Sequence, residues 1–126
     1  MAHVLYAVAN ATGKAASLVS KEHSGDDCKI FAEGVTHTGG KDNNWIYLPD
    51  CSDSRYWADH HITVKADDGS WVVSFWVDDD NGRKFYWSDF DGFTTNHPVD
   101  ASVDVTDCAL MIVMDGAKPR VVWTAW

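Results

Sequence analysis

The most constraining feature of this sequence is a series of three alternating segments in the middle of the chain. Apolar and polar side chains alternate in residues 60–66, 70–77 and 83–88, as they do in β-strands with one buried face. The connections 67–70 and 78–82 are rich in Asp and contain Gly, which suits tight hairpin turns. The three segments therefore predict an antiparallel meander.

The register of this meander can be predicted, because a slip of one residue exchanges the two faces of a strand. A four-residue first connection pairs Val64 with Val73. A five-residue second connection, 78–82, then pairs Phe75 with Phe85 and Val73 with Trp87. This register collects most of the large apolar side chains on one face, which we expect to face the core.

The opposite face of the meander carries an unusual set of side chains. In the predicted register His61, Trp76 and Lys84 form one row across the strands, with Tyr86 beside it. We call this set of residues the aromatic platform. Two interpretations follow: a helix or second sheet covers this face and buries Trp76, or the platform is exposed and binds a ligand.

The sequence as a whole predicts a single all-β domain covering residues 1–126. Of the 19 acidic residues in the 126-residue chain only two are Glu, and Asp favours turns whereas Glu favours helices. We expect an antiparallel β-sandwich or open barrel of about eight to ten short strands. Residues 14–22 are read either as one short helix or as a strand. Further candidate strands are residues 3–9, 28–35, 44–48, 101–106, 109–114 and 120–126.

Charge and hydropathy exclude several classes of function. The formal net charge is −9, and such a chain repels the phosphate backbone, so we expect no nucleic-acid partner. No apolar run approaches the roughly 18 residues of a membrane-spanning helix. The first residues show no signal peptide, so we expect a cytoplasmic protein, or a secreted one if the chain is a mature form. Three cysteines allow at most one internal disulfide.

Metal and cofactor sites are not expected. His60 and His61 are adjacent in a predicted strand, so their side chains point to opposite faces and cannot share a metal ion. The acidic turns lack the spacing of an EF-hand calcium loop. Calcium bound by the carboxylates of these turns is the one cofactor that the sequence leaves as an alternative.

The surplus of Trp and Asp predicts a lectin-like, non-catalytic carbohydrate-binding protein. The chain has seven Trp and four Tyr, and an exposed ring offers a flat partner for the apolar face of a sugar. Carboxylates and amides on loops form the directional hydrogen bonds that hydroxyls need. The residues expected to contact the glycan are Trp76, Tyr86, His61, Lys84, Asp89, Asp91 and Asn96.

One segment has a local resemblance to a known family. Phe85-Tyr86-Trp87, followed by Gly92 and by Thr95-Asn96, resembles a segment of the aegerolysins, which are small acidic β-sandwich proteins that bind membrane lipids. The likeness covers twelve residues and lacks the Cys-Pro-Trp that normally follows the aromatic triplet. The resemblance implies, as an alternative function, a lipid-binding or pore-forming β-sandwich.

Two further alternatives follow from other residues. A small hydrolase would hold His61 or His97 beside an Asp. For glycoside hydrolysis by paired carboxylates, Asp89 and Asp91 are the candidates. A homodimer would be favoured by the apolar run 121–126, because an apolar strand at the end of a chain can pair across subunits.

Overall fold

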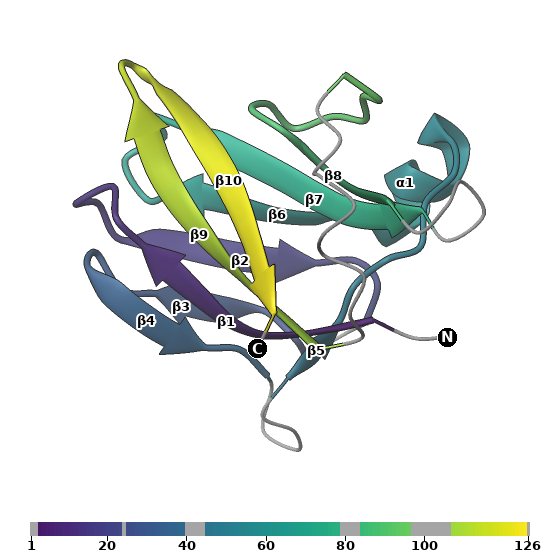
Figure 1. The fold of residues 1–126 in the computed structure, drawn as a ribbon, viewed down its shortest axis with the longest axis horizontal. Coiled ribbons are helices and arrows are strands. Elements are labelled where there is room, and N and C mark those ends of the chain that lie inside the picture. The colour runs from purple at the N-terminus through teal and green to yellow at the C-terminus, as the bar shows by residue number, and fades with distance from the viewer. Residues whose placement is uncertain (1–2, 24, 40–44, 79–83, 97–106, 126) are drawn as a thin grey trace.

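The computed structural model is all-β and sandwich-like, with two five-stranded sheets and one short helix (Figure 1). It describes residues 3–23, 25–39, 45–78, 84–96 and 107–125. The inner faces of the two sheets enclose the main hydrophobic core. Its largest fully buried members include Phe75, Phe85, Leu5, Leu18, Ile62 and Leu110. The predicted fold class is confirmed.

Sheet A contains both ends of the described chain. Its strand order is β10 (Lys118–Ala125), β9 (Asp107–Asp115), β1 (Val4–Asn10) and β4 (Gly34–His37), and β5 (Ile46–Tyr47) also pairs with β1. The pairing of β1 with β9 is parallel, whereas the other pairs are antiparallel. The sandwich is therefore mostly antiparallel, and the pairing of β1 with β9 is the exception among the named strands.

Sheet B contains the predicted meander. Its strand order is β3 (Cys28–Ile30), β2 (Ala16–Ser20), β6 (Ile62–Ala66), β7 (Val72–Asp78) and β8 (Lys84–Ser88), all antiparallel. The meander β6–β7–β8 is thus confirmed, and so is the register of its first hairpin, in which Val64 pairs with Val73.

The predicted register of the second hairpin is wrong by two residues. Phe75 pairs with Trp87 rather than with Phe85, and Trp76 pairs with Tyr86. The connection is therefore residues 79–83 and not 78–82. A shift of two keeps every side chain on the same face, so the alternation of apolar and polar residues could not distinguish the two registers.

Of the two interpretations of residues 14–22 the strand is confirmed, and the one helix among the described residues was not predicted. Residues 14–22 form no helix but contain β2, in which Ala16 and Leu18 are buried and Val19 is exposed on the opposite face. The one helix, α1 (Ser54–His60), begins after Asp53, whose side chain accepts a 2.8 Å hydrogen bond from the Tyr56 backbone N–H. The predicted strand 101–106 lies outside the described residues.

Candidate functional site

The Trp76 and Tyr86 rings of the aromatic platform are buried, and the prediction of an exposed sugar-stacking surface at this place is wrong. Trp76 is 1% exposed and Tyr86 is 4% exposed. The two rings stack with their centroids 6.0 Å apart, and Trp76 also stacks on Phe93 at 5.0 Å. Together with Cys51 they form a second hydrophobic cluster, against which Trp57 of α1 packs. The covering element that the sequence left as an alternative is therefore present.

The two polar members of the platform lie elsewhere. His61 is the residue that follows α1, and its ring stacks on Trp57 at 4.6 Å. Lys84 is exposed and pairs with Asp78 across the β7–β8 hairpin, not with Trp76. His60 is the last residue of α1 and His61 follows it, so the expectation that both lie in a strand is wrong.

A different hollow lies where three chain segments meet at the end of the sandwich away from α1. Its volume is about 400 Å³, which is in the range of small-molecule sites. Residues of the β6–β7 turn, of the segment after β8 and of the β9–β10 hairpin form its walls. Figure 1 shows where these elements lie in the fold. We call it the Phe90 groove, and its lining consists of Lys65, residues 69–72, residues 89–90 and residues 117–119.

The Phe90 ring is presented to solvent by a firmly held backbone. Phe90 is 45% exposed, whereas Ser74 and Ser88 are fully buried beneath it. Their hydroxyls lie 3.0 Å and 2.8 Å from the Phe90 carbonyl oxygen, and the Ser88 hydroxyl is also 2.7 Å from the Gly92 carbonyl. The Gly92 N–H donates to the same Phe90 carbonyl at 3.0 Å. Buried hydrogen bonds thus fix the loop that carries an exposed ring.

Gly92 determines where this ring can lie. A Cβ atom at position 92 would come within 2.3 Å of Cε2 of Phe90. The ring therefore folds over a position that has no side chain, and it can keep this place only while residue 92 is glycine.

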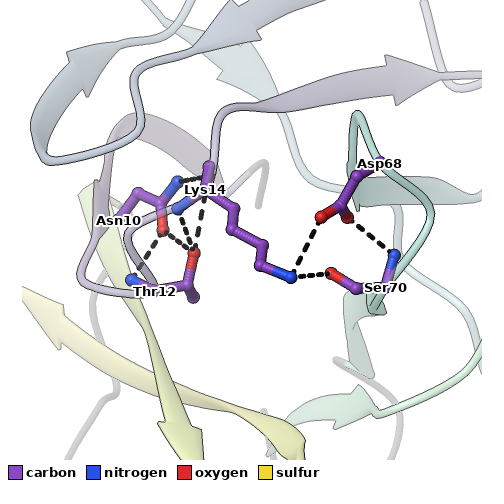
Figure 2. Close-up of polar contacts among 5 residues, drawn as sticks. All are labelled: Asn10, Thr12, Lys14, Asp68 and Ser70. Atoms are coloured by element: carbon purple, nitrogen blue, oxygen red, sulfur yellow. Dashed lines mark hydrogen bonds and ion pairs between the residues drawn. The ribbon is translucent and has the colours of Figure 1, made fainter.

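A polar network holds the turn that forms the opposite wall of the groove (Figure 2). The Ser70 N–H donates to Asp68 at 2.9 Å, and the Lys14 ammonium lies 2.9 Å from the Asp68 carboxylate and 3.1 Å from the Ser70 hydroxyl. Hydrogen bonding from Ser70, followed by the contact with Lys14, lowers the pKa of Asp68 to about 2. The β1–β2 turn, itself tied together by Asn10 and Thr12, is thereby joined to the groove.

The polar side chains of the groove combine both signs of charge. Asp89 is partly buried and lies 3.7 Å from the ammonium of Lys118, whose own side chain is 80% exposed. Lys65 is exposed and has no ion pair within the part of the chain that the structure describes. An aromatic ring, a carboxylate and two ammonium groups therefore line one hollow.

The groove overlaps only partly with the residues chosen from the sequence. Asp89 lines it, whereas Asp91 and Asn96 are exposed on the same loop without contributing to the lining. Phe90, Lys65 and Lys118 were missed. Phe90 was recognisable as an aromatic residue between two acidic ones, but Lys118 approaches from a hairpin distant in sequence.

A second polar cluster joins α1 to the β2–β3 connection. The His60 Nδ1 lies 3.0 Å from the Glu22 carboxylate, and the Tyr56 ring stacks on His60 at 3.9 Å. Burial raises the pKa of Glu22, although His60 acts to lower it. Within the described ranges no three His, Cys, Asp or Glu side chains gather closely enough to hold a metal ion.

The three cysteines are free thiols. Cys51 and Cys108 are fully buried, and burial raises the pKa of each to about 12. Cys28 is half-buried, and burial raises its pKa as well. Thiols of this kind are protonated at neutral pH and are poor nucleophiles.

Comparisons with known protein families, with curated proteins and with solved structures give no match for this chain. The twelve-residue resemblance to aegerolysins thus gains no support from them. In the described part of the chain, no helix has both the length and the apolar character needed to cross a membrane.

Proposed function

We propose that this protein is a non-catalytic glycan-binding protein and that the Phe90 groove is its binding site. The observation that carries the proposal is an exposed aromatic ring held rigidly at the rim of a hollow that also contains charged hydrogen-bonding groups. The Phe90 groove thus takes the place of the aromatic platform, whose two rings are buried, as the proposed binding site.

Each part of the groove matches one chemical feature of a sugar. The ring of Phe90 offers a flat apolar face against which the C–H groups of a pyranose can stack. The Asp89 carboxylate accepts hydrogen bonds from hydroxyls, and the ammonium groups of Lys65 and Lys118 donate them. Because the backbone around Phe90 is already fixed, little conformational entropy is lost when a ligand binds.

The proposal is tested by screening the purified protein on a glycan array and measuring the best ligand by calorimetry. Phe90→Ala removes the stacking surface, and we expect the affinity to fall about tenfold, or about 1.4 kcal/mol. Phe31→Ala is the matched control, since Phe31 is 63% exposed and does not line the groove. It should leave the affinity unchanged.

Four results would contradict the proposal. The protein could be folded by circular dichroism and bind no glycan, or Phe31→Ala could weaken binding as much as Phe90→Ala does. Turnover of the bound glycan would instead favour the hydrolase alternative. Binding to lipid vesicles without any glycan binding would favour the lipid-binding alternative.

A further inference from the structure

We infer that the ligand of the Phe90 groove is an acidic oligosaccharide, one that carries sulfate or carboxylate groups and extends across the outer face of sheet B. This inference rests on the proposed function and adds a ligand class to it. It follows from a second hollow on the same face and from the distribution of charge between the two.

The second hollow lies over β2 and β3. Its volume is about 410 Å³, and it is lined by Ser17, Leu18, Val19, Asp27, Cys28 and Lys29. We call it the Lys29 groove. Its partly exposed members Ser17 and Lys29 belong to the outer face of sheet B, since their neighbours Ala16 and Ile30 are buried in the core.

One row of paired residues connects the two hollows. Lys29 pairs with Ser17, Ser17 pairs with Lys65, and Lys65 pairs with Val72 across four adjacent strands. The first two residues of this row line the Lys29 groove and the last two line the Phe90 groove. The row is therefore the direct path from one hollow to the other.

The length of this path exceeds a single sugar ring. Adjacent strands lie about 4.8 Å apart, so the row that runs through both hollows, from Lys29 to Val72, spans three spacings or about 14 Å. A monosaccharide can occupy one hollow, whereas a chain of several sugars can occupy both. Binding along a continuous surface should therefore favour an oligosaccharide.

The charges along the path favour an anionic ligand. Each acid beside it has a partner. Asp67 lies 2.7 Å from the Ser17 hydroxyl and 3.5 Å from the Lys29 ammonium, and Asp68 lies 2.9 Å from the Lys14 ammonium. Of the two acids that line the hollows, Asp27 accepts a hydrogen bond from the Ser20 N–H at 2.9 Å, and Asp89 lies 3.7 Å from the Lys118 ammonium. Lys65, in the middle of the row, has no such partner among the described residues. An anionic group on the ligand would supply the missing counter-charge.

The net charge of −9 does not prevent this interaction. At physiological ionic strength exposed charges are screened beyond about 8 Å. Lys14, Lys29 and Lys118 each lie beside an Asp carboxylate. Lys65 is therefore the lysine that determines the local potential for a bound sulfate or carboxylate. The distant acids mainly slow the approach of an anionic ligand at low salt.

Calorimetry with three probes tests the inference: a neutral tetrasaccharide, the same tetrasaccharide carrying sulfate groups, and one sulfated monosaccharide. We expect the sulfated tetrasaccharide to bind most tightly and the monosaccharide most weakly. Lys65→Gln should weaken binding of the sulfated tetrasaccharide about fivefold, as for one exposed ion pair. Lys21→Gln removes the same charge from an exposed residue beyond the other end of β2, and it should leave the affinity unchanged.

The outcomes separate this inference from the function on which it rests. Equal affinity for the neutral and sulfated tetrasaccharides, or equal effects of Lys65→Gln and Lys21→Gln, would overturn the acidic ligand but leave glycan binding intact. Equal affinity for the sulfated monosaccharide and tetrasaccharide would overturn the extended path. Failure of every probe and of every arrayed glycan to bind would overturn the proposed function itself.

Discussion

Replacement of Trp76 by alanine tests whether the outer face of the meander is covered. Trp76 is 1% exposed and stacks on Tyr86 and Phe93. A buried Trp removes about 150–250 Å² from water, and at about 25 cal/mol per Å² this amounts to about 4–6 kcal/mol as an upper bound. Large-to-small replacements of buried aromatic residues cost about 3–5 kcal/mol, and we expect a loss in this range.

The loss is measured by chemical denaturation, as the change in the free energy of unfolding. If Trp76→Ala does not fold, Trp76→Phe keeps part of the ring and should still cost more than 1 kcal/mol, in the usual range for a buried volume change. Phe31→Ala is the control, because Phe31 is 63% exposed and surface replacements stay within about 0.5 kcal/mol. Equal stabilities of Trp76→Ala and Phe31→Ala would refute the burial of the aromatic platform.

Three further predictions concern the groove, the α1 contact and the thiols. Gly92→Ala should displace the Phe90 ring, whose Cε2 lies 2.3 Å from the added Cβ, and calorimetry should show a glycan affinity about tenfold lower with less than about 1 kcal/mol of stability lost. Because burial raises the pKa of Glu22 from its ordinary 4.5, its contribution to stability is full below pH 4.5 and is lost as the pH rises through the folded-state pKa. In thermal melts, the stability of Glu22→Gln relative to that of the natural chain should therefore increase as the pH rises from about 4 to about 7. A stability difference that is the same at every pH would contradict this. A thiol reagent with mass-spectrometric readout should modify half-buried Cys28 in the native protein but reach Cys51 only on unfolding; equal rates would show that Cys51 is not covered.

The fold was largely predictable, because sheet B follows simple alternation. The pairing of Val64 with Val73 was predicted from the faces of two strands and the length of one turn. The second hairpin was not, since a slip of two residues leaves both faces unchanged. The β2 strand was ambiguous because Ala16 and Leu18 favour a helix by intrinsic propensity, and burial against the core overrides that preference.

The site was predictable only in part, because alternation identifies the face of a strand but not what covers that face. Trp76 was assigned to the outer face of the meander, and a covering helix was one of two alternatives. That residues 54–60 form a helix and bring Trp57 against the cluster was not predicted. The only local signal for α1 was Asp53 as an N-cap within a polar stretch. Asp89 was predicted, whereas its partner Lys118 enters from a hairpin that no local pattern connects with it.

Mapping a bound ligand by heteronuclear NMR tests the central claim, that glycans are recognised at the Phe90 groove. The sulfated tetrasaccharide is titrated into the isotope-labelled protein, and amide shifts are followed residue by residue. We predict the largest shifts at Ser70, Phe90 and Lys118, with smaller ones at Ser17 and Lys29, at the other end of the row. Shifts confined to sheet A or to α1, or the absence of any shift at saturating ligand, would contradict the account.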